Sequence, residues 1–177
     1  MKLEMTLNGR PVAFDIAGHE RLLDLLREKG CFGVKRGCEA GECGACAVQV
    51  DGKTICSCLF LAGMAHGRAV TTIEGIGTME SPHPLQEAFV EVGAVQCGYC
   101  IPAMVLSAKE LLEHTPNPKE DEIRRGMEGH LCRCTGYVKQ FEAVKLAAKR
   151  LSEPAKPKGK SKSDAGAKKA ARGGSRR

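Results

Sequence analysis

Residues 34–52 read VKRGCEAGECGACAVQVDG, and the three cysteines of this stretch are the most informative residues in the chain. Cys38, Cys43 and Cys46 have the C-x4-C-x2-C spacing that, with a fourth cysteine downstream, is typical of a plant-type 2Fe-2S loop. Glycines lie between these thiols, and glycine lets backbone N–H groups approach and hydrogen-bond the sulfurs of a cluster. A zinc site is the alternative, but a four-residue gap between the first two thiols is unusual for zinc.

The fourth ligand of this first group is not decided by spacing. Cys56 and Cys58 both follow the segment AVQVDGKTI, in which Asp51-Gly52 predicts the turn of a hairpin. A hairpin carries the chain back toward the loop, so either cysteine can return to the iron.

A second group of four cysteines lies in the C-terminal half of the chain. Cys97 and Cys100 form a C-x2-C pair, and Cys132 and Cys134 form a C-x-C pair after 31 intervening residues. This spacing alone also suits zinc. Each pair, however, comes just before a predicted helix, so two helix N-termini would direct backbone N–H groups at one anionic centre. We therefore predict a second 2Fe-2S site here.

The N-terminal half changes from a strand period to a helical period. Apolar residues alternate through residues 3–7 and 12–16 on either side of Asn8-Gly9, which predicts a β-hairpin. From Glu20 the period becomes helical, and Gly30 stands where a C-terminal cap belongs. With the second hairpin, this order predicts a small α+β sheet domain of β-grasp type over residues 1–76.

The C-terminal half is predicted to be helical. Pro102 suits the first turn of its second helix, and Asn117-Pro118 predicts a cap and a first-turn proline for the third. Four short helices favour a compact four-helix bundle over residues 84–151. The boundary is expected in GIGTMESPHP, where glycine, serine and proline collect. The predicted helices are residues 85–92, 101–114, 119–127 and 137–151.

The positive charge of the chain belongs to its C-terminal end. The formal net charge is +6, yet residues 152–177 hold nine Lys/Arg against two Asp/Glu, which leaves 18 against 19 for residues 1–151. Residues 152–177 contain no apolar residue larger than alanine or proline and are rich in Lys, Ala, Gly, Ser and Pro, so we expect a basic disordered tail. The chain shows no apolar segment of signal-peptide or membrane-spanning length, and we expect a reducing, cytoplasmic location without membrane insertion.

Five motifs together resemble the small iron-sulfur subunit of the molybdenum hydroxylases, the family of xanthine dehydrogenase, aldehyde oxidase and aerobic carbon monoxide dehydrogenase. The resemblance covers about residues 2–150, nearly everything except the tail. The motifs are VKRGCEAGECGACAVQVDG, SCLFLAG, HPLQEAF, QCGYCIPAMV and GHLCRCTGY.

The resemblance implies one 2Fe-2S cluster in a plant-ferredoxin-like domain and another in the helical domain. The family motif ends Ser-Cys-Leu, which matches residues 57–59 and implies that Cys58 is the fourth ligand. It also implies that Gln96 and Cys134 approach the pterin of a molybdenum cofactor on a large partner subunit, with FAD on a medium subunit. The implied iron ligands are Cys38, Cys43, Cys46, Cys58, Cys97, Cys100, Cys132 and Cys134.

Three further residues have expected roles outside the two sites. The family usually has Asn where His130 stands, and we expect His130 to be a surface or capping residue because four thiols already fill its site. We expect Cys31 and Cys56 to behave as small buried hydrophobic residues.

The predicted function is electron transfer within an oxidoreductase complex, from the molybdenum centre through both clusters to a flavin or another acceptor. The chain would bind no substrate and supply no catalytic residue. One alternative is a free-standing two-cluster ferredoxin. Another is a zinc module with a nucleic-acid-binding tail, but the chain has no Trp and only two Tyr for base stacking, so we expect no nucleic-acid partner.

Overall fold

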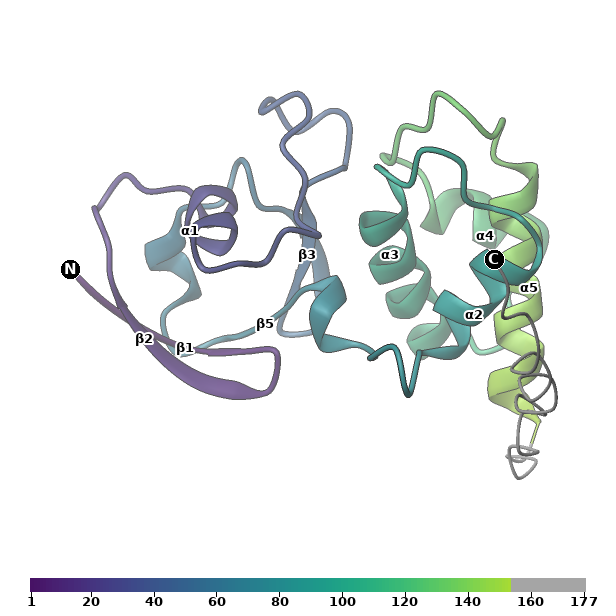
Figure 1. Ribbon diagram of the computed structural model, residues 1–177, viewed down its shortest axis with the longest axis horizontal. Coiled ribbons are helices and arrows are strands. Elements are labelled where there is room, and N and C mark those ends of the chain that lie inside the picture. The colour runs from purple at the N-terminus through teal and green to yellow at the C-terminus, as the bar shows by residue number, and fades with distance from the viewer. Residues whose placement is uncertain (154–177) are drawn as a thin grey trace, which may run out of the picture.

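A computed structural model describes residues 1–153 of the chain as a five-stranded sheet followed by a group of helices (Figure 1). The strand order is β2-β1-β5-β3-β4. The predicted mixture of sheet and helix is therefore confirmed. The tail predicted over residues 152–177 lies outside the described residues, apart from its first two. The strands are β1 (Lys2–Leu7), β2 (Arg10–Asp15), β3 (Ala47–Val50), β4 (Lys53–Cys56) and β5 (Ala69–Thr71).

Both predicted hairpins are present. β1 pairs antiparallel with β2, and β3 pairs antiparallel with β4. The turn residues Asn8 and Gly9 have φ values of 50° and 77°, and Asp51 and Gly52 have 50° and 81°. Positive φ at both positions is what a type I′ turn requires, so the Asn-Gly and Asp-Gly pairs explain where each strand reverses.

Strand β5 joins the two hairpins into one sheet. It lies parallel to β1 and antiparallel to β3, with Val70 opposite both Leu7 and Val50. Three residues are too few to show an alternating pattern, which is why the sequence did not predict this strand.

Helix α1 (Leu22–Glu28) covers the sheet and closes the first core. Its four leucines are all buried with Leu3 and Met5 of β1. The helix begins two residues after Glu20, and Gly30 follows its C-cap with φ 88°, as expected. A short 3₁₀ turn at Ala62–Ala65 lies between β4 and β5, and a second at Ile73–Gly75 leads out of the sheet half.

The remaining helices enclose a second core that includes Phe89, Met104, Ile123 and Val144. Helix α2 packs mainly on α5, and α3 contacts both α2 and α4. The observed bounds differ from the predicted ranges by one residue at most. They are α2 (Pro84–Glu91), α3 (Ile101–His114), α4 (Glu120–Gly126) and α5 (Val138–Ser152).

The predicted start of the third helix in this half is wrong in detail. The N-cap is Lys119, whose N–H donates to the Glu122 carboxylate at 2.6 Å. The Glu122 side chain thus accepts the backbone N–H of the N-cap residue, as in a capping box. Asn117 therefore does not cap the helix, and Pro118 lies before the N-cap instead of in the first turn.

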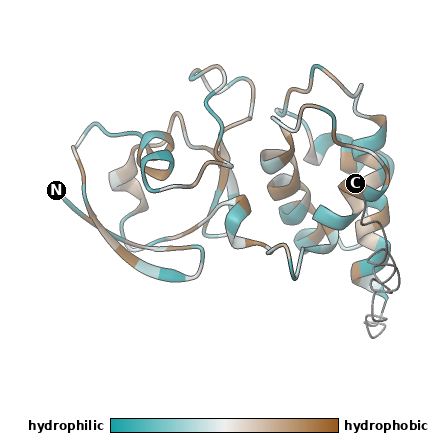
Figure 2. Cartoon of the chain, viewed as in Figure 1, coloured by the Kyte–Doolittle hydropathy of each residue, from teal (hydrophilic) through white to brown (hydrophobic). Residues whose placement is uncertain are grey.

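Helix α3 joins the two halves of the chain, because it packs against β3 and β4 as well as against the other helices. Figure 2 shows apolar residues along α3, which stands between the sheet and the remaining helices. Gln49 of β3 is buried and donates through Nε2 to the Leu106 carbonyl at 3.1 Å. The Thr54 N–H of β4 donates to the Glu110 carboxylate at 2.7 Å.

Among residues 1–153, no helix combines the length and the apolar character needed to cross a membrane.

Helix α2 generates a prediction about pH. The Nδ1 atom of His83 accepts a hydrogen bond from the Leu85 N–H at 3.2 Å, which requires an unprotonated Nδ1. Burial, and then the nearby Lys109, lowers the pKa of His83 from 6.5. The unfolded chain therefore takes up this proton first as the pH falls. The contribution to stability is complete above about pH 6.5 and is lost as the pH declines toward the folded pKa.

We expect the substitution His83→Asn to reduce this dependence, because asparagine caps a helix without titrating. Between about pH 7.5 and about pH 5.5 the thermal midpoint of the variant should fall by a few degrees less than that of the wild type. Circular dichroism melts at both pH values measure the difference. Equal falls in the two proteins would contradict the prediction.

Candidate metal centres

The segments that carry the two groups of cysteines lie on the same side of the molecule. In Figure 1 residues 37–46 and the two segments 94–100 and 128–137 all run along the upper edge, beyond the ends of β3 and α3. The fold thus brings together thiols that are up to 96 positions apart in the sequence.

A network of ion pairs fixes the first cysteine loop to α1. Glu39 pairs with Arg21 at 2.6 Å and with Arg36 at 3.0 Å, and Asp24 of α1 pairs with the same two arginines. Glu39 has φ 57°, an uncommon value for a residue other than glycine. Two acids shared between two arginines hold this residue in place more firmly than an isolated surface pair would.

Three backbone N–H groups converge on the Cys38 sulfur. They belong to Ala40, Glu42 and Cys43, at 3.4, 3.3 and 3.3 Å. These donors lower the pKa of the Cys38 thiol to about 6. Such a ring of N–H groups stabilises a thiolate, which is the form that binds iron.

The glycines of this loop allow the backbone to approach the thiols closely, as expected. The three N–H groups that reach Cys38 come from other residues. Gly37 is needed because a Cβ there would lie 2.6 Å from the Cys43 sulfur. A Cβ at Gly41 would overlap the side chain of Leu59. The glycines therefore provide space around the thiols, and the backbone N–H of Gly41 also hydrogen-bonds the Cys58 sulfur.

The structure brings both candidates for the fourth ligand to the first group. Burial, followed by the Cys46 thiol, raises the pKa of Cys58, and burial also raises the pKa of Cys56, whose thiol likewise contacts that of Cys46. Cys58 is only 3% exposed, whereas Cys56 is half-buried and its sulfur lies 3.8 Å from the Gly41 carbonyl oxygen. Proximity alone does not separate the two, and the choice of Cys58 stays a prediction.

The four cysteines of the second group form two contacting pairs. The thiols of Cys97 and Cys134 are hydrogen-bonded to one another on the surface, and those of Cys100 and Cys132 are hydrogen-bonded below them. Burial, with the Cys132 thiol, raises the pKa of Cys100 to about 12.

The pKa of the Cys132 thiol is shifted in the opposite direction from that of Cys100. Its burial is outweighed by hydrogen bonds from the Thr135 hydroxyl and from the N–H groups of Cys134 and Thr135, which lower the pKa to about 7. The Thr135 oxygen lies 3.1 Å from the Cys132 sulfur. The fully buried Gln140 of α5 donates to the Cys100 sulfur at 3.8 Å. Sequence reasoning missed both polar partners, although Thr135 lies inside the CRCTGY motif.

The expectation of two helix N-termini at this site is correct for α3 and wrong for α5. Cys100 is the N-cap of α3. Helix α5 instead starts after Tyr137, a left-handed N-cap with φ 69°, and this leaves three residues between Cys134 and the helix. The Tyr137 hydroxyl accepts from the Cys132 N–H at 2.8 Å and so fixes the loop, while the donors to the Cys132 sulfur come from Cys134 and Thr135.

Three hydrogen bonds tie the two cysteine loops to each other. The Leu131 N–H donates to the Cys43 carbonyl at 3.0 Å, and the Tyr99 hydroxyl donates to the Arg36 carbonyl at 2.6 Å. The third joins His130 to the Gly44 carbonyl at 3.3 Å. Of the two roles expected for His130, a surface or a capping residue, the surface position is wrong, because this residue is 8% exposed and lies between the loops.

The donor set fits iron-sulfur clusters. Each group offers four thiols, and one thiol in each group has a lowered pKa. Within residues 1–153, no three His, Cys, Asp or Glu side chains converge tightly enough to coordinate a single metal ion. The geometry that carries the assignment is therefore the contact between thiols and the N–H groups around them.

Two protein families match the chain. Residues 5–68 match the 2Fe-2S iron-sulfur cluster binding domain, and residues 72–145 match the [2Fe-2S] binding domain. The first match contains the first cysteine group and the second match contains the second group.

Two relatives are similar to the chain along most of their length. The chain is 47% identical to the nicotinate dehydrogenase small FeS subunit of Eubacterium barkeri, over 85% of this chain and 96% of that protein. It is 44% identical to the xanthine dehydrogenase iron-sulfur-binding subunit of Escherichia coli O157:H7, over 76% and 86%.

Solved structures share the fold. The quinoline 2-oxidoreductase of Pseudomonas putida 86 superposes with a TM-score of 0.82 at 40% identity, over 85% of this chain and 94% of that one. The aldehyde oxidoreductase of Desulfovibrio gigas gives a TM-score of 0.83 at 39% identity, and the match covers 17% of its much longer chain.

The competition between Cys56 and Cys58 generates a prediction. We expect the substitution Cys58→Ala to abolish one of two reduced-cluster EPR signals and to lower the iron content by about half, because an iron would lose a ligand. The matched substitution Cys56→Ala should leave both signals. Loss of a signal in Cys56→Ala together with two intact signals in Cys58→Ala would reverse the assignment.

Proposed function

Because this chain belongs to the family of small iron-sulfur subunits of the molybdenum hydroxylases, we propose that it conducts electrons from a molybdenum cofactor on a large partner subunit to a flavin or another acceptor. The observation that carries the proposal is the Leu131–Cys43 hydrogen bond, which links a loop that holds three thiols of the first group to a loop that holds two thiols of the second. The relatives are named as subunits, which favours this role over that of a free-standing ferredoxin.

Each half of the chain would hold one 2Fe-2S cluster. Residues 1–76 form a ferredoxin-like domain of β-grasp type in this proposal, and residues 84–151 form a four-helix bundle. When bound, the clusters supply one-electron redox chemistry. The proposed iron ligands are Cys38, Cys43, Cys46, Cys58, Cys97, Cys100, Cys132 and Cys134.

The residues of the chain prepare these sites in two ways. N–H groups and hydroxyls, directed at Cys38 and Cys132, favour thiolates before any metal binds. Burial of Cys46, Cys58 and Cys100 keeps water from one side of each site. Both effects tune the environment of a cluster, since hydrogen bonds to sulfur and solvent exposure set its potential.

One exposed face is suited to the large partner. Gln96 and Cys134 are exposed, so a pterin held by another chain can reach them. Around them lie exposed apolar side chains that a partner would cover, namely Tyr99, Leu131 and Val138. We propose that Gln96 and Cys134 contact the pterin, that a medium subunit with FAD receives the electrons, and that the complex is cytoplasmic.

The assembled enzyme tests this placement through the substitution Gln96→Ala. Loss of a hydrogen bond to the cofactor should slow molybdenum-to-cluster electron transfer, or reduce the molybdenum content, by about tenfold while both clusters stay assembled. Stopped-flow reduction by substrate, with metal analysis, measures both quantities.

The neighbouring substitution Val95→Ala serves as a control, because Val95 is also partly exposed and should change neither quantity. Unchanged transfer and molybdenum content in Gln96→Ala would remove the pterin contact from the proposal.

A further inference from the structure

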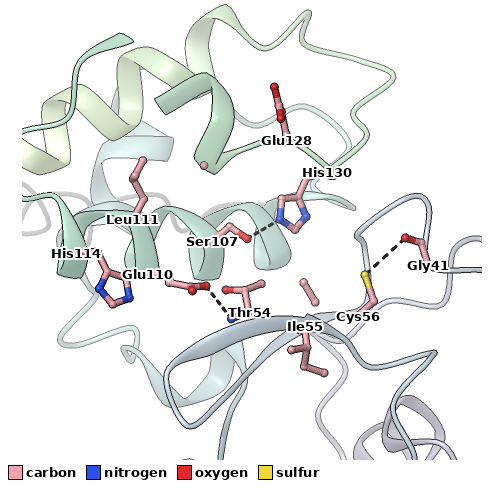
Figure 3. Close-up of a pocket in the computed structure, with 13 residues that line it drawn as sticks. Gly41, Thr54, Ile55, Cys56, Ser107, Glu110, Leu111, His114, Glu128 and His130 are labelled. Carbon is pink, nitrogen blue, oxygen red and sulfur yellow. Dashed lines mark hydrogen bonds between the residues drawn. The ribbon is translucent and has the colours of Figure 1, made fainter. Parts of the chain in front are cut away.

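His130 lies at the point where the two cysteine loops meet. It stands in the segment between α4 and α5, two residues before Cys132, and its imidazole is buried. Nε2 lies 2.5 Å from the Ser107 hydroxyl oxygen of α3, and Nδ1 lies 3.3 Å from the Gly44 carbonyl oxygen. Figure 3 shows the imidazole directed at Ser107 beside the loop that contains Gly41.

The two contacts fix the tautomer of the imidazole. The Gly44 carbonyl can only accept a hydrogen bond, so Nδ1 carries the proton and donates. In the neutral imidazole Nε2 is then the acceptor, and the Ser107 hydroxyl donates to it. A neutral His130 thus joins three separate elements, which are the first cysteine loop, the second cysteine loop and α3.

The backbone around His130 is in close contact. Gly44 has φ +69°, and a Cβ there would overlap the Gly129 carbonyl oxygen and lie 2.5 Å from His130 Nδ1. The next residue, Leu131, donates its N–H to the Cys43 carbonyl at 3.0 Å. One hydrogen bond therefore joins Cys43, a proposed ligand of the first group, to Leu131, which precedes Cys132 of the second group.

The contact between the two cysteine loops at His130 lies beside a gap in the packing of the two halves. A cavity of about 440 Å³ lies directly behind His130, between β4 and α3, and Thr54, Cys56, Glu110 and His114 line it (Figure 3). Next to the loops, a cavity therefore interrupts the packing of α3 on β4 that joins the two halves elsewhere. Polar contacts rather than a shared apolar core hold the loops together at this end.

We propose that His130 is a positioning residue that sets the separation of the two clusters by clamping the first cysteine loop, the second cysteine loop and α3 together. The inference rests on the proposed function, because it assigns the clamp to two clusters. Electron transfer between carriers slows steeply as their separation grows, so a clamp at this point governs passage between the halves. The ligands themselves need no contact with His130 for this role.

Two readouts test the clamp in the full-length holoprotein. Hydrogen–deuterium exchange, followed by mass spectrometry, reports the protection of the Leu131 amide in peptides that span residues 128–135. The mutual broadening of the two EPR signals in the fully reduced protein reports the separation of the clusters. The substitution His130→Phe keeps a ring of similar volume and removes both hydrogen bonds.

In His130→Phe we expect exchange of the 128–135 peptides to increase by about tenfold or more and the mutual broadening to decrease. His130→Asn should give intermediate values, because its amide has both a donor and an acceptor but a shorter reach. The matched control is His114→Phe, the same change on the same cavity, which should leave both readouts at wild-type values.

The outcomes separate the clamp from the proposed function. Unchanged exchange and broadening in a His130→Phe protein with full iron content would overturn the clamp. If that variant does not fold, Ser107→Ala removes one of the two hydrogen bonds and decides by the same readouts, with smaller changes in the same direction expected. A wild-type protein without two clusters would overturn the proposed function, and exchange alone would still test whether His130 joins the loops.

Discussion

Four thiolates cannot share one site without compensation, because each negative charge raises the pKa of the next. The rest of this structure depends on how that repulsion is met. At Cys38 three backbone N–H groups lower the pKa, while at Cys100 burial raises it. Iron would supply the remaining positive charge and join the four thiols of each group. Each half of the chain has a small core, and a cluster would stabilise it as a metal stabilises other small domains.

The same constraint explains the design of the loops. A chain that wraps around a cluster cannot also form a helix or a strand, so its conformation must be fixed by other means. The first loop uses the ion pairs of Glu39 with Arg21 and Arg36. The second uses the hydroxyl of Tyr137. Helix α3 then serves both halves, since it begins at Cys100 and packs against β3 and β4.

The parts of the fold that depend on local rules could be predicted from the sequence. Asn8-Gly9 and Asp51-Gly52 specify tight turns, and the cysteine spacing specifies the first loop. Other features depend on contacts between distant segments. Strand β5 exists because β1 and β3 lie on either side of it, and His130 is buried because Gly44 and Ser107 meet it from elsewhere in the chain. The delayed start of α5 follows from a left-handed Tyr137, a conformation that no propensity favours.

The central claim is that both groups of four thiols hold iron-sulfur clusters. Iron, acid-labile sulfide and zinc, measured per chain in protein purified without oxygen, test this most directly when combined with EPR of the reduced sample. The account predicts about four iron and about four sulfide per chain, with two distinguishable 2Fe-2S signals. About two zinc per chain without sulfide, or iron for a single cluster only, would contradict it.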